Sequence, residues 1–438
     1  MSRKKIVCIL VVLGCLLCVV WRPQRITLKV GIFAGSNWDV PNGDCYKIID
    51  QAIERYEEEN PDIHIEYESG ILKDDYSEWL SAQYLKGEEP DIFMVLSEDF
   101  NTLSALGALK NLDDFMQKDS QFHSDDYYEN ALLAGQYQHH QYALPYESNP
   151  TLMFVNQTLL QKENIDLPSN DWTLDDFYNI CQQVTKDTNN DGQIDQYGCY
   201  NYDWLDSVYS HEVSLFDETG QTCYLNQEPV KNAIAFIQRL NQLNKGYTVT
   251  SQDFDTGKVA FSPMPFAQYR TYKPYPYRVQ KYSQFEWDCV PMPGMTESRS
   301  EVSSLLMGIS ARTSYGQQAW DFLKLLTYDQ ETQESLFRYS QGISSLKTVI
   351  QSTEALSLLN EESLGDTQVD LSLLNDVMEN AMNQNQFRKY NATLTMMDTQ
   401  IQQMIQNNED LDLSLMSLQN EVNAVSYTHL TLPTNSRV

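Results

Sequence analysis

The 438-residue chain lacks the short motifs that mark common enzymes, and it is poor in basic residues. No GxSxG, HExxH, GxGxxG or phosphate-binding loop motif occurs, which argues against the enzyme classes that use them. Three of the eight cysteines lie in the first 18 residues, and the other five are widely spaced without a CxxC pair, so no disulfide framework is implied. Internal repeats, low-complexity tracts and coiled-coil heptads are also missing.

Positive charge is scarce. The chain carries 30 Lys and Arg against 61 Asp and Glu, for a formal net charge of −31. A polyanion of this strength is well solvated and does not bind nucleic acid through phosphates. We therefore expect no nucleic-acid partner, and we favour simple solvation over a specific cationic partner.

The one long apolar run lies at the N-terminus. Three basic residues precede an unbroken apolar segment from Ile6 to Trp21, which is typical of an export signal whose basic flank stays cytoplasmic. The segment VLGC, ending at Cys15, resembles a bacterial lipobox in which Cys15 takes the lipid. Six further apolar residues follow, as in an uncleaved anchor. Under both alternatives, residues 1–23 tether a domain to the outer face of a bacterial membrane.

The opposite end of the chain is expected to be foreign. The sequence VSYTHLTLPT, which begins at Val425, resembles the translation of a transposon adapter used in sequencing-library preparation. Residues 425–438 are therefore excluded from the fold prediction.

Between these ends, short strands alternate with helical patterns. Residues 27–33 and 91–96 form apolar strand-like runs, 63–67 alternates as a half-exposed strand does, and helical spacing covers 46–56 and 75–86. This βαβαβ order predicts an open α/β sheet. A second α/β region begins near Tyr142, and it includes a helix opened by a Thr173–Asp176 capping box. Roughly 400 residues exceed what one core usually holds, so two lobes are expected.

A set of ordered segments resembles one known family: bacterial extracellular solute-binding proteins of the carbohydrate-transport type, which include maltose-binding protein. Each segment alone is a weak match to the family, but the segments occur in the family's order over almost the whole chain beyond the export signal. They are EENPDIHI from Glu58, EPDIFMVLSEDFNTLSALGALKNL from Glu89, YALPYESNPTLMFVN from Tyr142, DWTLDD from Asp171, TKDTNNDGQIDQYG from Thr185, GKVAF from Gly257, VPMP from Val290 and AWDFL from Ala319.

The resemblance implies a type II periplasmic-binding-protein fold, in which two α/β lobes, each a mainly parallel sheet flanked by helices, close on a solute. The chain is expected to cross between the lobes near residues 146–149, 303–308 and 343–347. Lobe 1 would then comprise residues 24–146 and 308–344, and lobe 2 residues 147–307 and 345–424. The implied function is the binding subunit of an importer of the ATP-binding-cassette (ABC) type. It would capture a mono- or oligosaccharide as a monomer, without a required cofactor, and deliver it to a permease.

Candidate ligand-binding residues follow from the sheet and from the family positions. In an open α/β sheet, ligands lie beyond the carboxyl ends of the strands, and sugars need flat apolar faces and planar hydrogen-bonding groups. For each candidate, burial in the core or a solvated loop is the alternative. The candidates are Trp38, Glu98, Asp99, Glu147, Asn149, Trp204, Tyr269, Arg270 and Tyr272.

Other functions stay open at this stage. The tyrosine-rich run from Tyr269 to Tyr282 would suit a binding protein for ferric iron, and a polyamine is another solute to consider. A ligand sensor for a membrane kinase and a surface glycosidase are alternatives from other classes.

One acidic loop fits part of a calcium-binding pattern. Positions 1, 3, 5, 7 and 9 of a calcium loop carry oxygen-bearing side chains, and Gly192 lies at the turn. Gly198 replaces the bidentate Glu that usually occupies position 12, and an Asx-rich surface turn is the alternative. Bound calcium would be structural and remote from the solute. The candidate ligands are Asp187, Asn189, Asp191, Gln193 and Asp195.

Overall fold

The computed structural model describes residues 25–217, 222–272, 285–361, 371–382, 387 and 390–430. The predicted export segment and its candidate lipidation residue Cys15 lie outside the described residues, as do residues 431–438 of the tail. Residues 425–430 continue the last helix, α21. Within the described part of the chain, no helix is long and apolar enough to cross a membrane.

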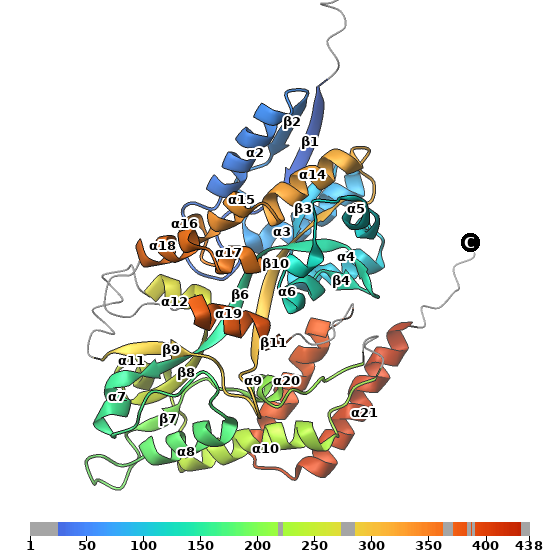
Figure 1. The fold of residues 1–438 in the computed structure, drawn as a ribbon. Helices are drawn as coiled ribbons and strands as arrows, with labels where there is room; N and C mark the ends of the chain where they lie inside the picture. The colour runs from blue at the N-terminus through green and yellow to red at the C-terminus, as the bar shows by residue number, and fades with distance from the viewer. Residues whose placement is uncertain are drawn as a thin grey trace, which may run out of the picture.

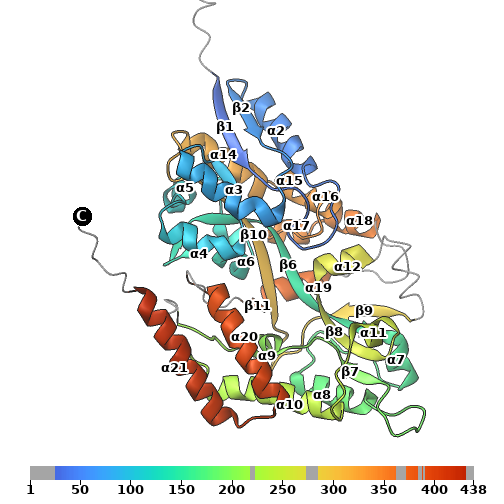
Figure 2. The ribbon, with the colours of Figure 1, turned by 180° about the vertical axis from the view of Figure 1, so that it is seen from behind.

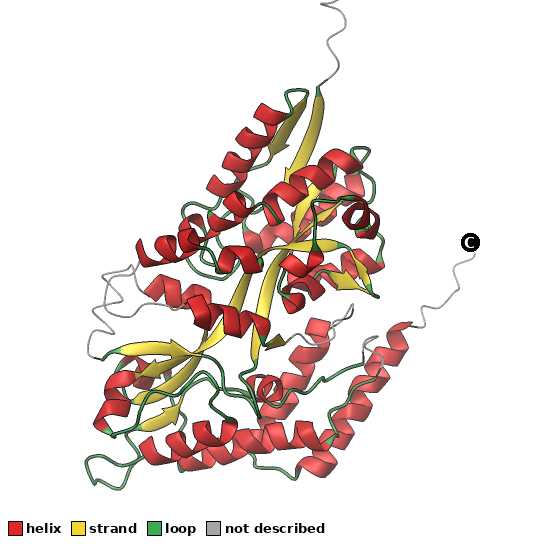
Figure 3. Ribbon diagram, in the orientation of Figure 1, coloured by secondary structure: helices red, strands yellow, loops and turns green. Residues whose placement is uncertain are grey.

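The molecule has two lobes, each with its own hydrophobic core (Figure 1). One core gathers Leu28, Phe93 and Trp320, and the other gathers Phe177, Phe261 and Ile401. The predicted α/β fold of two lobes is confirmed. The helices lie outside the strands in both lobes (Figure 3).

Lobe 1 begins with the predicted βαβαβ unit, in which β1 pairs in parallel with both β2 and β3. Helix α3 ends at Gly87, whose φ of 70° gives the left-handed C-cap that glycine adopts without strain. The elements are β1 (Ile26–Gly31), α2 (Lys47–Glu59), β2 (Ile63–Tyr67), α3 (Lys73–Lys86), β3 (Ile92–Val95), α4 (Ser97–Ala105), α5 (Asp113–Lys118), the 3-10 turn η1 (Ser124–Asp126), α6 (Glu129–Leu133), β4 (Gln136–Tyr137) and β5 (His140–Gln141).

Two long strands, β6 (Ala143–Asn156) and β10 (Ser300–Ile309), run from one lobe into the other. They pair antiparallel from Gly308↔Ala143 to Val302↔Pro150. At its lobe 1 end β10 pairs with β3, while the lobe 2 end of β6 pairs with β8 and β9. The strand order is therefore β2-β1-β3-β10-β6-β8-β7, with antiparallel pairs in the middle and parallel pairs at both edges.

Lobe 2 is built mainly from the middle of the chain. Helix α8 starts at the predicted capping box, since the Thr173 side chain accepts the Asp176 N–H and the Asp176 carboxylate accepts the Thr173 N–H. The elements are α7 (Gln157–Lys162), α8 (Leu174–Val184), β7 (Tyr197–Cys199), α9 (Trp204–Ser210), α10 (Glu228–Leu243), α11 (Ser251–Asp255), β8 (Val259–Pro265), α12 (Phe266–Tyr272), β9 (Trp287–Val290), α20 (Tyr390–Gln406) and α21 (Leu411–Leu430).

The boundary near residue 345 differs from the expectation. Leu358, Leu374 and Val377 were assigned to lobe 2, yet they belong to the lobe 1 core because the apolar faces of α18 and α19 pack there. Helix α19 lies between the lobes in both views (Figures 1 and 2), and the chain enters lobe 2 only beyond it. The elements are α14 (Gly316–Thr327), α15 (Gln330–Glu334), α16 (Leu336–Tyr339), α17 (Lys347–Ile350), α18 (Thr353–Glu361), α19 (Leu371–Glu379) and β11 (Ala381–Met382).

All three segments predicted to cross between the lobes meet at one point. Ser148 on β6 bonds through its hydroxyl to the hydroxyls of Ser304 at 2.8 Å and Ser345 at 2.7 Å. The backbones of Ser148 and Ile343 also exchange two hydrogen bonds of 2.8 Å. This serine junction is buried and marks the hinge between the lobes.

Candidate functional site

Four side chains from separate parts of the sequence converge beside the serine junction, and we call them the hinge cluster: Trp38, Glu147, Arg270 and Ser340. Trp38 comes from the loop after β1, Glu147 from β6, Arg270 from α12 and Ser340 from the segment after α16. Sequence analysis had singled out the first three. Their convergence follows from the sheet, because the loop after β1 opens toward the point where β6 leaves lobe 1.

Glu147 is the centre of the hinge cluster. It is 3% exposed, and its Oε2 accepts a short hydrogen bond from the Ser340 hydroxyl. Burial raises the pKa of Glu147 to about 7, against the opposing effects of Ser340, the Trp38 indole and the positive charge of Arg270. The Trp38 N–H faces this carboxylate, although its geometry falls short of a full hydrogen bond. Glu147 therefore titrates near neutral pH.

The backbone also closes tightly around this carboxylate. A Cβ at Gly342 would lie 2.8 Å from Trp38 Nε1, 3.0 Å from Glu147 Oε2 and 3.0 Å from the Ser148 carbonyl oxygen. Only glycine fits there without displacing one of these groups, so the hinge cluster is packed against the main chain.

Arg270 is 4% exposed, and its guanidinium donates to main-chain carbonyls rather than projecting into open space. The acceptors are the carbonyl oxygens of Phe337 at 2.5 Å, Ser340 at 2.6 Å, Gly342 at 3.3 Å and Leu336 at 3.5 Å. Asn149 supports the same helix, since its Oδ1 accepts the Ala267 N–H at 2.9 Å near the start of α12. Both residues thus order α12 at the hinge.

Two predicted aromatic contacts are corrected by the structure. Trp204 is 1% exposed within the lobe 2 core, and its Nε1 donates to Asp398 at 2.8 Å. Tyr269 is 3% exposed and stacks on Phe266 with ring centroids 5.7 Å apart. Both rings lie on the buried faces of short helices, so neither offers an open stacking surface. Tyr272 ends α12, but its side chain lies outside the described residues, as do residues 273–282 of the tyrosine-rich run.

Glu98 and Asp99 lie in the first turn of α4, directly after β3, as the strand-end rule places them. Glu98 is exposed, and Asp99 is half-buried and accepts the Ser77 hydroxyl at 2.5 Å. Neither side chain hydrogen-bonds to the hinge cluster in the described part of the chain. Acidic side chains in a first helical turn also offset the positive end of the helix dipole.

A cavity of about 140 Å³ lies between the lobes, lined by β10 and by residues of both lobes. We call it the interlobe cavity. Sequence analysis missed its most polar side chains, although Glu301 lies two residues before a predicted crossing. Its lining residues are Ser97, Phe100, Ala134, Tyr209, Glu301, Val302, Ser303, Ser304, Leu306, Tyr390, Asn391 and Leu394.

Among the residues that line the interlobe cavity in the described part of the chain, Glu301 is the one acidic side chain. Burial and the nearby Asp203 carboxylate raise the pKa of Glu301, while a hydrogen bond from the Tyr209 hydroxyl opposes the rise. Burial and the Asp203 charge likewise raise the pKa of Asp206. Among the described residues that line the cavity, none is basic. The cavity therefore offers one carboxylate together with serine hydroxyls and an asparagine amide beside two tyrosine rings.

The acidic loop of lobe 2 is folded as a series of Asx turns. Asp187 accepts the Gly192 N–H at 2.7 Å, Asn189 accepts the Asp191 N–H at 2.8 Å, and Asp191 accepts the Gln193 N–H at 2.8 Å. Across the described part of the chain, no three carboxylate, histidine or cysteine side chains gather as a metal site requires. Calcium binding stays a prediction, and it requires the loop to exchange these hydrogen bonds for metal ligation.

Calcium is expected to raise the melting temperature of the wild-type protein, because a ligand that binds only the folded state stabilises it by mass action. The measurement is thermal unfolding in calcium and in chelator. The Asp191→Ala variant, which removes one candidate ligand, should melt alike in both. A wild type that is indifferent to calcium would leave the loop with its turn structure alone.

The arrangement defines a class of protein: two α/β lobes joined at a hinge, with polar and aromatic side chains facing the junction. The chain belongs to the bacterial extracellular solute-binding protein family, whose sequence model matches residues 51–357. The predicted resemblance is thereby confirmed, and extracellular location follows for the family.

Solved structures share the fold at low sequence identity. The sugar-binding protein MalE from Xanthomonas citri has a TM-score of 0.76 and 12% identity, covering 92% of this chain and 98% of that one. The cyclic alpha-maltosyl-1,6-maltose binding protein from Arthrobacter globiformis has a TM-score of 0.72 and 14% identity, covering 92% and 99%. An ABC substrate-binding protein from Listeria monocytogenes, in complex with cycloalternan, has a TM-score of 0.66 and 16% identity, covering 92% and 99%.

Proposed function

We propose that this protein is the substrate-binding subunit of an ABC importer and that it captures a mono- or oligosaccharide between its lobes. It acts as a monomer, tethered by its N-terminal segment at the outer face of the membrane, and it passes the sugar unchanged to a permease pair. Support comes from the family, from sugar-binding proteins with the same fold, and from the polar and aromatic lining of the lobe junction.

The mechanism is lobe closure about the serine junction. Few strands join the lobes, so rotation at this point moves each lobe nearly as a rigid body. A solute that contacts both lobes stabilises the closed state through contacts it cannot make in the open state. The interlobe cavity of about 140 Å³ is smaller than usual small-molecule sites of roughly 300–1,000 Å³. Entry of an oligosaccharide therefore needs the lobes to separate.

The observation that carries the proposal is Glu301, a carboxylate that faces the interlobe cavity beside the Tyr209 hydroxyl. A sugar hydroxyl can donate to this carboxylate, and hydrogen bonds to charged acceptors are worth about 1.5–3 kcal/mol. Glu301→Gln keeps the shape and removes the charge. It should weaken the cognate sugar about tenfold or more.

The experiment is a thermal-shift screen over neutral mono- and oligosaccharides, followed by calorimetric titration of the hits. Glu66→Gln is the matched control, because Glu66 is an exposed carboxylate on β2, at the far edge of the lobe 1 sheet. The bound sugar should be recovered unaltered after long incubation. Conversion of the sugar would instead favour the surface glycosidase.

A cationic solute is the second candidate, and the Glu301 carboxylate in the interlobe cavity favours it. Glu301 lies in the field of Asp203 and Asp206, and no described lining residue is basic. A polyamine would supply the missing positive charge. The same screen therefore includes polyamines, and a shift with polyamines but with no sugar would replace the sugar proposal.

A further inference from the structure

Helix α12 is attached to lobe 2 through the chain, but its Phe266 and Tyr269 side chains pack in the lobe 1 core. It follows directly on β8, and its Tyr269 ring packs edge-on against Phe154 at 5.7 Å and Trp287 at 5.4 Å. Phe154 lies on the part of β6 that pairs with β8, and Trp287 begins β9. Helix α12 therefore bridges the lobes: the chain joins it to β8 of the lobe 2 sheet, and its rings pack with the lobe 1 core.

Arg270 reaches from this helix into lobe 1. Its guanidinium binds the carbonyls of Leu336 and Phe337 in α16, and those of Ser340 and Gly342 beyond it. Helix α16 packs in the lobe 1 core through Leu336 and Phe337. The Leu336 carbonyl also accepts the Ser340 N–H at 2.9 Å, so the shorter arginine bonds to Phe337 and Ser340 are the main ones.

The contact between the Arg270 guanidinium and these carbonyls suits the geometry of an arginine and is shielded from water. A guanidinium presents several N–H donors in a fixed plane, so it can bind several carbonyls that point to one place. At 4% exposure these charge-assisted bonds are screened little by solvent. They therefore differ from the surface ion pairs of this chain, which are individually weak.

The segment from Leu336 to Gly342, whose carbonyls accept the Arg270 hydrogen bonds, directly precedes the hinge. Gly342 is followed by Ile343, which exchanges backbone hydrogen bonds with Ser148 on β6. A rotation that parts α12 from α16 must break the arginine contacts, whereas the serine junction at the pivot can survive it. The arginine contact can thus form in one arrangement of the lobes and is lost in another.

We propose that Arg270 is a positioning residue for solute capture: an interlobe clasp that holds α12 against α16 and favours the closed arrangement of the lobes. Only the closed fraction of the protein is competent to hold solute in both lobes, so the clasp raises apparent affinity in proportion to that fraction. The inference rests on capture by lobe closure but not on the identity of the solute.

The test compares Arg270→Met, Arg270→Lys and the wild type without any solute. Genetically encoded spin labels at Gln117 on α5 and Asn241 on α10, both exposed, report the interlobe distance and leave the native cysteines unmodified. Arg270→Met should shift the distance distribution to longer values. Arg270→Lys keeps the charge with fewer donors and should lie between.

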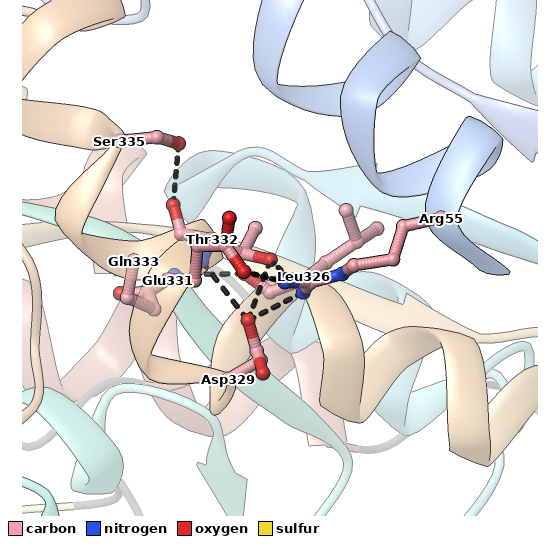
Figure 4. Close-up of polar contacts among 7 residues, drawn as sticks. All are labelled: Arg55, Leu326, Asp329, Glu331, Thr332, Gln333 and Ser335. Atoms are coloured by element: carbon pink, nitrogen blue, oxygen red, sulfur yellow. Dashed lines mark hydrogen bonds and ion pairs between the residues drawn. The ribbon is translucent and has the colours of Figure 1, made fainter.

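Arg55 provides the matched control (Figure 4). It joins α2 to α15, donating to Glu331 at 2.6 Å, to Thr332 at 2.7 Å and to Asp329, and all these contacts are within lobe 1. Arg55→Met should lower the melting temperature and leave the interlobe distance as in the wild type. A purely structural role for Arg270 predicts the same behaviour for Arg270→Met.

The clasp is overturned if Arg270→Met has the wild-type distance distribution, or if Arg55→Met shifts it equally. If Arg270→Met does not fold, Arg270→Lys decides by the same measurement. Because no solute is present, a failed sugar screen does not affect this result. Once a solute is known, its affinity for Arg270→Met should fall about fivefold or more.

Discussion

Replacing Glu147 with glutamine is expected to stabilise the protein at pH 8 and to leave its stability almost unchanged at pH 4. Burial raises the pKa of Glu147 from 4.5 to about 7. The folded state therefore holds this proton more tightly than the unfolded state does. Below pH 4.5 Glu147 is protonated in both states and does not destabilise the wild type. As the pH rises from 4.5 to about 7, the free energy of unfolding of the wild type falls.

The full difference is on the order of 3 kcal/mol above pH 7, because each pKa unit corresponds to about 1.4 kcal/mol. The measurement is the melting temperature of both proteins from pH 4 to pH 8. The glutamine keeps an oxygen that can accept the Ser340 hydroxyl, so the neutral side chain is accommodated. Curves that stay parallel over this range would contradict a Glu147 pKa near 7.

Glu57 offers a control of opposite sign. Burial opposes its ionisation, but the Ile65 N–H and His64 outweigh that effect and lower its pKa. Its contribution is present above the unfolded pKa and lost on acidification. Glu57→Gln should therefore be less stable than the wild type at neutral pH and approach it as the pH falls.

Truncating Trp204 to alanine should cost about 3–5 kcal/mol of unfolding free energy, the range for large aromatic side chains removed from a core. The ring is 1% exposed in the lobe 2 core, and its removal also leaves the Asp398 carboxylate without its donor. The measurement is denaturant unfolding followed by a probe of lobe 2. Any loss of solute binding should track the unfolded fraction.

Two further variants serve as comparisons for the loss of stability expected in Trp204→Ala. Trp204→Phe refills most of the volume but not the bond to Asp398, so it should cost less than the alanine. Trp38→Ala removes a half-buried ring in a loop and should cost less still. If Trp204→Ala were as stable as the wild type but bound solute weakly, Trp204 would have to lie in the cleft.

The sequence determined the fold class and the order of the elements, because strand and helix periodicity and turn residues act locally. Ordered family segments placed the hinge near Ser148 and Ser304, and the strand-end rule directed attention to the Trp38 loop. These inferences needed only residues that are close together in the chain, or the rule that ligands lie beyond the carboxyl ends of the strands. The βαβαβ unit and the Thr173 capping box followed in the same way.

Tertiary structure alone decided which side chains face the junction and which are buried. Trp204 and Tyr269 occupy helices whose exposed face depends on what packs against them, which local sequence does not specify. Glu301, Tyr209 and Tyr390 meet in one cavity although they are about 90 to 180 positions apart. The same holds for α17 to α19, whose apolar faces would fit either lobe by pattern, and only the packing against the lobe 1 core assigns them.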